Sequence, residues 1–163
     1  MLIGAYTSGN FTLGNDGNGH VLITDPPVVA QKPGNAAARI ADGTVLEVDV
    51  ADSGKVTFGG TNGTLLLDDA SLFTGAVAGF RGLDRIDLAQ IGFGAETTLG
   101  YAANAAGTGG TLRVSDGVHT ASIALLGNYM AASFATAADG HGGTLITEAD
   151  QAAHTPLASP RHA

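Results

Sequence analysis

The chain has 163 residues, which is about the size of one domain, and it contains no cysteine, which excludes disulfides and thiolate metal sites. Acidic residues outnumber Lys and Arg by 15 to 7, for a net charge of −8, and the seven cations are scattered along the chain. This pattern argues against a nucleic-acid or anionic-membrane partner, because such partners require clustered cations. No apolar run reaches the roughly 18 residues of a membrane span.

The N-terminal segment is a partial repeat of a later one. Residues 1–25 align without a gap with residues 124–148, and 10 of the 25 positions are identical. Both copies contain an Asp-Gly pair between short apolar runs, Asp16-Gly17 in the first and Asp139-Gly140 in the second. Such a pair favours a hairpin turn, since glycine accepts the positive φ that the turn requires. We therefore predict that residues 1–25 form a partial copy of the end of a repeat unit.

Residues 26–39 are predicted to be a linker. Pro26, Pro27 and Pro33 lie in this stretch, and proline cannot donate a hydrogen bond to a ladder. The main unit is predicted to span residues 40–149. The last residues, 150–163, combine small, polar and proline residues and predict a flexible tail.

The first half of the main unit predicts regularly spaced strands. Five short β-like runs are closed by Gly, Asp or Asn, and their centres are Leu46, Val56, Leu66, Val77 and Ile86. Centres about ten residues apart leave no room for helices and favour two strands per coil of roughly 20 residues, as in a parallel β-solenoid or β-roll. An antiparallel β-sandwich is the alternative, because its turns recur at the same spacing.

The second half predicts antiparallel hairpins. One has its turn at Asp116-Gly117, and the next has its turn at Asp139-Gly140. Between them a short helical turn is expected, and Tyr129 and Phe134 are expected to cap the core. The predicted fold class is all-β, with a parallel β-roll followed by antiparallel hairpins.

Residues 77–93, VAGFRGLDRIDLAQIGF, carry a resemblance to a known family. They resemble the segment that follows the calcium-binding nonapeptides of RTX (repeats-in-toxin) proteins. The matching positions are Phe80, Asp84, Ile86, Asp87, Leu88 and Ile91. Around this segment, residues 40–148 are similar to β-roll modules attached to secreted bacterial proteins, although no complete copy of the nonapeptide G-G-x-G-x-D-x-U-x occurs.

The resemblance implies an extracellular protein that leaves the cell by type I secretion, without a cleaved N-terminal signal. It also implies a parallel β-roll, calcium-assisted folding and a non-catalytic role. The first residues lack the basic region and long apolar core of a secretory signal peptide, which leaves either the cytoplasm or export by a route that uses no cleaved N-terminal signal.

Four aspartates at the ends of predicted strands are candidate calcium ligands. Oxygen-rich turns can supply the six to eight ligands that calcium takes. The alternative is turn chemistry, in which Asp side chains accept hydrogen bonds from nearby backbone N–H groups. The candidates are Asp68, Asp69, Asp84 and Asp87, with Asp49 and Asp52 as weaker ones.

The predicted function is that of a secreted, non-enzymatic β-module with a structural or adhesive role. Its expected partners are a polysaccharide or a cell surface, and residues 1–25 are expected to pack on the main unit or on a second molecule. No nucleophile elbow and no phosphate loop occurs in the sequence. A fragment of a carboxylate-based polysaccharide lyase or epimerase is the alternative from another class.

Overall fold

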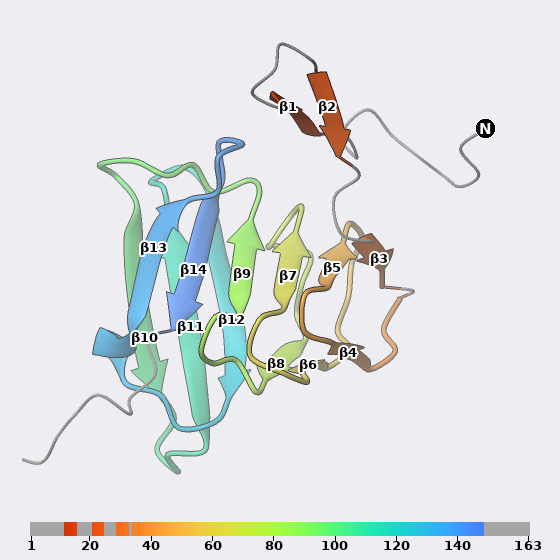
Figure 1. Ribbon diagram of the computed structural model, residues 1–163. Coiled ribbons are helices and arrows are strands. Elements are labelled where there is room, and N and C mark those ends of the chain that lie inside the picture. Colours follow the sequence, from red (N-terminus) through yellow and green to blue (C-terminus); the bar gives the residue numbers. More distant parts are fainter. Residues whose placement is uncertain (1–11, 16–20, 25–28, 33, 149–163) are drawn as a thin grey trace, which may run out of the picture.

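The structure is a computed structural model that describes residues 12–15, 21–24, 29–32 and 34–148 (Figure 1). It is all-β, as the sequence predicts, with one two-stranded sheet and two mixed six-stranded sheets. Within these ranges the only helical element is a single 3-10 turn, η2, Ala131–Ser133. No helix in the described ranges is long and apolar enough to cross a membrane.

The two large sheets, here sheet I and sheet II, take their strands alternately from the chain. Sheet I has the order β10-β11-β12-β8-β6-β4 and sheet II the order β13-β14-β9-β7-β5-β3. The strands of sheet I are β4 (Ala38–Ile40), β6 (Val56–Phe58), β8 (Ala76–Ala78), β10 (Thr98–Ala103), β11 (Gly109–Ser115) and β12 (Thr120–Leu126). Those of sheet II are β3 (Val29–Gln31), β5 (Val45–Val48), β7 (Thr64–Leu67), β9 (Arg85–Leu88), β13 (Phe134–Ala138) and β14 (Thr144–Glu148).

From β3 to β9 the chain crosses from one sheet to the other at every step. Odd-numbered strands pair in parallel in sheet II, so that Val45 pairs with Thr64 and Thr64 with Arg85. Even-numbered strands pair in parallel in sheet I, where Val56 pairs with Val77. These partners lie 19 or 21 residues apart, close to the expected length of about 20 residues. An odd-numbered strand together with the even-numbered strand that follows it is called a coil. Parallel pairing rules out the purely antiparallel sandwich.

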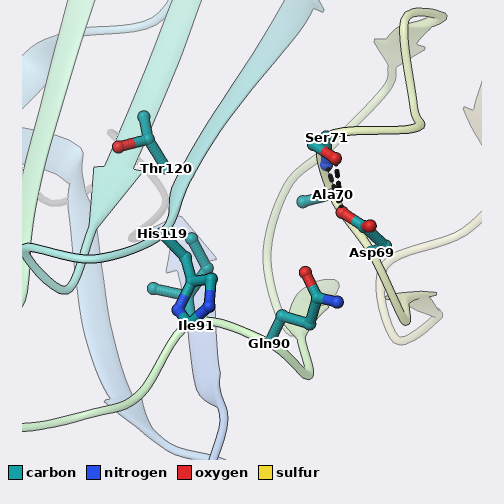
Figure 2. Close-up of a pocket in the computed structure, with 7 residues that line it drawn as sticks. All are labelled: Asp69, Ala70, Ser71, Gln90, Ile91, His119 and Thr120. Atoms are coloured by element: carbon teal, nitrogen blue, oxygen red, sulfur yellow. Dashed lines mark hydrogen bonds between the residues drawn. The ribbon is translucent and has the colours of Figure 1, made fainter.

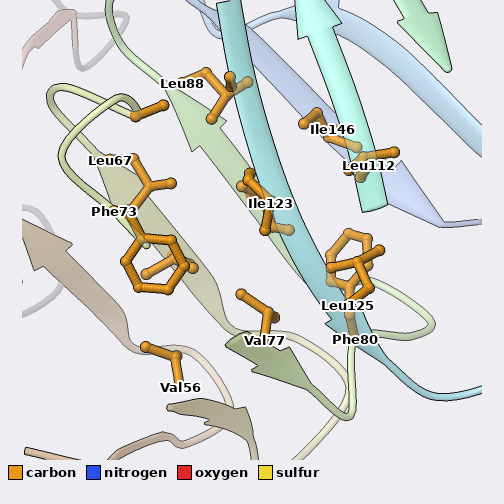
Figure 3. Packing of buried hydrophobic residues seen from close by; sticks show 14 of the residues in the cluster. Val56, Leu67, Phe73, Val77, Phe80, Leu88, Leu112, Ile123, Leu125 and Ile146 are labelled. Atoms are coloured by element: carbon orange, nitrogen blue, oxygen red, sulfur yellow. The ribbon is translucent and has the colours of Figure 1, made fainter. Parts of the chain in front are cut away.

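Alternation along each strand builds the core between the sheets. In β7, Leu65 and Leu67 are fully buried, whereas the residues beside them are partly exposed. The same two-residue alternation buries Ile86 and Leu88 of β9. Val77 of sheet I joins the same hydrophobic cluster (Figure 3). The five predicted β-like runs are thus confirmed as β5 to β9.

Both predicted hairpins of the main unit are confirmed. Strands β11 and β12 are antiparallel and joined at Asp116-Gly117, where Gly117 has a φ of 90°. Strands β13 and β14 are antiparallel, and Gly140 in their turn has a φ of 87°. The two hairpins join the parallel strands in different ways. Strand β12 pairs in parallel with β8 of sheet I, whereas β14 pairs antiparallel with β9 of sheet II.

The repeat is visible in the pairing register. Strands β1 (Thr12–Asn15) and β2 (Val21–Thr24) pair antiparallel, with Thr12 opposite Thr24. In the C-terminal hairpin Ala135 lies opposite Thr147, and each of these residues is 123 positions after its counterpart. The hairpin predicted in residues 1–25 is therefore confirmed for its strands, while Asp16 and Gly17 lie outside the described residues. The predicted tail, residues 150–163, also lies outside them.

The expectation that residues 26–39 carry no ladder is wrong. Val29–Gln31 forms β3 and pairs with β5, and Ala38 begins β4, which pairs with β6. In the sequence the prolines stand on either side of Val29–Gln31 rather than within it, so they remove none of its own N–H donors. The stack of parallel strands therefore begins before residue 40.

Aromatic rings close the end of the core next to the hairpins. Phe80 contacts Phe58 and Phe134, with ring centroids 5.4 Å and 6.4 Å apart. Phe134 in turn packs against Tyr129 at 5.6 Å and Tyr101 at 5.2 Å. The predicted capping role of Tyr129 and Phe134 is confirmed, since both belong to or pack against the core cluster.

Glycine permits the close stacking of the coils at Gly54 and Gly75. A Cβ atom built on Gly75 would clash with the backbone carbonyl of Gly54, one coil earlier. Backbone atoms cannot give way as the end of a flexible side chain can, so any larger residue forces the two coils apart.

We expect Gly75→Ala to lower the free energy of unfolding by about 1–3 kcal/mol, because it overpacks this contact. Thermal melting followed by circular dichroism measures the change. Gly100→Ala is the matched control, since a Cβ atom at Gly100 meets no atom within 4 Å. Equal melting temperatures for the two variants would show that coil stacking does not depend on Gly75.

Candidate functional site

The four predicted calcium ligands lie at different places on sheet II. Asp68 and Asp69 follow the end of β7, whereas Asp84 precedes β9 and Asp87 lies within it. Because β7 and β9 are parallel, Asp84 stands at the opposite end of the strands from Asp68 and Asp69. The four carboxylates therefore do not converge on one point.

Asp84 links two neighbouring coils. Its side chain is almost fully buried, at 1% exposure. Oδ1 accepts the backbone N–H of Gly63 in the preceding coil at 2.8 Å, and Oδ2 accepts that of Arg81 at 3.1 Å. Burial raises the pKa of this carboxyl, although both hydrogen bonds oppose the shift. The turn-chemistry alternative thus describes Asp84 better than metal ligation does.

The same kind of link recurs along the stack. Oδ1 of Asn35 accepts the N–H of Ser53 at 2.9 Å, and Oδ1 of Asp42 accepts the N–H of Thr61 at 2.7 Å. Each bond joins residues 18 or 19 positions apart, and therefore joins one coil to the next. We call these contacts coil links, meaning side-chain oxygens that accept a backbone N–H from a neighbouring coil.

A buried ion pair also joins the first coil to the second. The Nζ atom of Lys32 contacts Oδ2 of Asp52, and both side chains are fully shielded from solvent. Lys32 also donates to the carbonyl of Gly34 at 2.8 Å, and the other oxygen of Asp52 accepts the N–H of Gly54 at 2.6 Å. Both charges are therefore hydrogen-bonded as well as paired, which is what allows them to be buried.

Asp87 has a different environment from Asp84. Its Oδ1 atom is buried and has no hydrogen-bond partner in the structure. Burial, and after it the nearby charges of Asp139 and Asp68, raise its pKa to about 6, while His141 opposes this shift. The pKa of Asp68 is also raised, by burial and by the charge of Asp49.

Asp139 and Gly140 form the turn that the repeat predicts. Oδ1 of Asp139 accepts the N–H groups of His141 at 2.6 Å and Gly143 at 2.9 Å. These bonds close the turn between β13 and β14, so the hairpin requires no ligand.

Calcium does not fit the predicted donor set well. Both oxygens of Asp84 are occupied by backbone N–H groups, and Oδ1 of Asp69 accepts two bonds from Ser71. In the part of the chain that the structure describes, no group of three or more His, Cys, Asp or Glu side chains could hold a metal ion. Calcium assistance stays a prediction from the resemblance, and no step below depends on it.

Asp69 instead lines a pocket of about 280 Å³ (Figure 2). The pocket lies where three connections meet: β7–β8, β9–β10 and the turn between β11 and β12. Its lining residues are Asp69, Ala70, Ser71, Gln90, Ile91, His119 and Thr120. Of these residues only Asp69 was predicted from the sequence as a site residue.

Lys32 and His119 carry no local sequence signal, and Asp52, a weaker calcium candidate, is instead the partner of Lys32. Lys32 and Asp52 are 20 residues apart, which is one coil, so the coil length is the only signal in the sequence that relates them. His119 shows no metal-ligand spacing with another histidine. It reaches the pocket because the β11–β12 turn lies beside the end of β9.

Comparisons with protein-family models, with curated proteins and with solved structures find no match. The proposals that follow therefore rest on the geometry and on the sequence patterns.

We expect Asp84→Ala to lower the free energy of unfolding by roughly 2–3 kcal/mol, because it leaves two N–H groups without their charged acceptor. The loss should be the same in calcium and in chelator, as measured by thermal melting. Asp49→Ala at an exposed position is the control and should change stability by less than about 0.5 kcal/mol. A calcium-dependent stabilisation that is present in the wild type and absent in Asp84→Ala would identify Asp84 as a metal ligand.

We expect Asp87→Asn to raise the melting temperature by a few degrees at pH 7.5. The pKa of Asp87 is raised in the folded state from its ordinary value of 3.8 to about 6. Ionising this group therefore costs the folded state stability as the pH rises from about 4 to 6, and the cost persists above that range.

The difference in melting temperature between variant and wild type should consequently shrink as the pH is lowered from 7.5 to 4. Taking the difference at each pH removes the contribution of the other carboxyls. A variant that melts at or below the wild-type temperature at pH 7.5 would contradict the environment described for Asp87.

Proposed function

We propose that the chain is a parallel β-roll module that serves as a non-catalytic scaffold in an exported protein that contains repeats. The observation that carries the proposal is the passage of β3 to β9 between the two sheets at every step. Two strands per coil and a partner about 20 residues away are the pattern of a stack in which each coil covers its neighbour.

The ends of the stack support a role in a longer assembly. Both large sheets terminate on their first strands, β3 and β4, and each of these has one partner among the described strands. An open strand edge is a template for pairing with another strand. At the other end the sheets terminate on β10 and β13, which also have one partner each among the described strands (Figure 1).

The N-terminal hairpin supports the expected repetition and self-association. Strands β1 and β2 have the pairing register of β13 and β14. In the main unit β14 pairs with β9, whereas β2 pairs only with β1 among the described strands. Residues 1–25 therefore carry the strands that close a unit of the same design, and we infer that they close a second such unit.

One face of sheet I is suited to contact with an extended surface. The outward residues of β10, β11 and β12 pair across the strands in three rows, which we call the outer face of sheet I. The rows are Ala102–Thr111–Ala124, Gly100–Arg113–Ser122 and Thr98–Ser115–Thr120. Apart from Arg113 these side chains are small, and all but the partly exposed Ser115 are exposed.

Such a flat, hydroxyl-bearing face supports adhesion to a polysaccharide or a cell surface, which is the partner class expected from the sequence. The lyase or epimerase alternative requires acids gathered around a groove with a nearby arginine. The pocket described above has a single carboxylate, Asp69, and no arginine in its lining. Export by type I secretion rests on the resemblance of residues 77–93 to RTX proteins.

We expect the full chain to be depleted from solution by at least one insoluble polysaccharide in a set of cellulose, chitin and cross-linked dextran. Ser122→Trp, in the middle of the outer face of sheet I, should weaken this binding at least about tenfold, because its bulk lifts a flat ligand off the face. Ala106→Trp in the β10–β11 turn is the matched control and should bind as the wild type does.

Circular dichroism melting of both variants checks that the fold is retained. Equal binding by Ser122→Trp and the wild type would overturn the assignment of this face. Formation of unsaturated sugar ends from a polyuronate, followed by ultraviolet absorbance, would overturn the non-catalytic assignment in favour of a lyase.

A further inference from the structure

The pocket at the end of β7 borders the outer face of sheet I, with which it shares Thr120, and has its own polar groups. Ile91 and Ala70 supply an apolar part and are buried, at 1% and 5% exposure. Polar side chains from three separate connections surround them, with Asp69 and His119 on different sides (Figure 2). A small apolar surface with a few convergent polar groups is the usual form of a ligand site.

Asp116 holds His119 in one orientation. Oδ1 of Asp116 accepts the N–H groups of Val118 at 2.8 Å and His119 at 2.6 Å, and Oδ2 accepts that of Gly92 at 2.9 Å. These bonds lower the pKa of Asp116, so that its carboxylate is charged. The Nδ1 atom of His119 lies 3.1 Å from Oδ2, and a carboxylate at that distance accepts its proton. The other ring nitrogen, Nε2, is left to contact a ligand.

Asp69 offers a second acceptor from the other side. Its Oδ1 atom accepts the N–H group of Ser71 at 2.9 Å and the hydroxyl of Ser71 at 2.6 Å. Hydrogen bonds from Ser71, then that from Gln90 and the charge of His119, lower the pKa of Asp69, so that it too is a charged carboxylate. Gln90 adds an amide, which both donates and accepts.

We propose that this pocket binds one sugar ring of a neutral polysaccharide. The carboxylate of Asp69 accepts hydrogen bonds, and the amide of Gln90 both donates and accepts them, so the site suits sugar hydroxyl groups, which do both. A volume of about 280 Å³ is close to the lower limit of ligand pockets. A bare metal ion fits less well, because no group of three metal-binding side chains occurs among the described residues.

The site shares only Thr120 with the outer face of sheet I, and the inference stands even if the rest of that face binds nothing. The test uses the full chain labelled with nitrogen-15 and titrated with methyl glucoside, cellohexaose and maltoheptaose. We expect at least one of the three sugars to shift the backbone amide signals of Asp69, Ser71, Gln90 and His119. The other hairpin turn, at Asp139–Gly143, should not respond.

Two variants should lower the affinity for whichever sugar shifts the amide signals at least about fivefold, and both should leave the melting temperature nearly unchanged. Asp69→Asn keeps an acceptor for Ser71 but loses the charge, and His119→Ala removes the ring while Asp116 keeps its backbone bonds. His141→Ala, an exposed histidine in the other hairpin turn, is the matched control and should bind normally.

Three outcomes would overturn the proposal. The first is that none of the three sugars shifts these amide signals. The second is that both variants bind as tightly as His141→Ala does. The third is that calcium or methylammonium shifts the same signals while the sugars do not, which would make the pocket a cation site.

Discussion

The hydrogen bond from a backbone N–H in one connection to a side-chain oxygen in the neighbouring coil is the interaction on which this fold depends. Short strands of three or four residues leave much of the backbone in connections, and buried N–H groups without partners are costly. Asp84 supplies an acceptor for the buried N–H of Gly63, and Asn35 and Asp42 supply acceptors at exposed positions between the first two coils. The stack is therefore held by its connections as much as by its apolar core.

The coil links give a structural role to acidic residues of this chain, which has few charged residues and an excess of acids. Here the carboxylates of Asp42 and Asp84 reach backbone donors directly, and Lys32 supplies the positive charge beside Asp52. Neighbouring coils are thus joined by protein groups at each of these places.

The sequence predicts the features that depend on neighbouring residues, namely the strands and the turns. The strands β5 to β9 follow from alternation within each run, and the turns at Asp116-Gly117 and Asp139-Gly140 follow from the φ that glycine allows. Strand β10 has no such signal, since its outer position leaves all of its side chains at least partly exposed. Strand β3 is only three residues long and stands between prolines in the sequence.

The candidate site was predicted less well, because its residues meet only across coils. Alternation predicts that Asp84 lies at a strand end but not that it faces Gly63, which is 21 residues earlier. Asp69 and Asp84 were both candidate calcium ligands, yet Asp69 lies at the other end of the strands and lines a pocket with His119 of a hairpin turn. The parallel register, which no local pattern encodes, decides both outcomes.

Connected aromatic rings of the core lie at the end next to the hairpins, so the two ends of the molecule differ in their packing. Phe80, Phe134, Tyr101 and Tyr129 form connected ring contacts there, while the coil of β3 and β4 contributes Lys32, paired with Asp52, and the buried side chain of Ile40. Amide hydrogen exchange should accordingly be fastest in the first coil and slow progressively toward the rings. Under mechanical load the molecule would unzip from its first coil, and the aromatic end would act as the anchor that yields last.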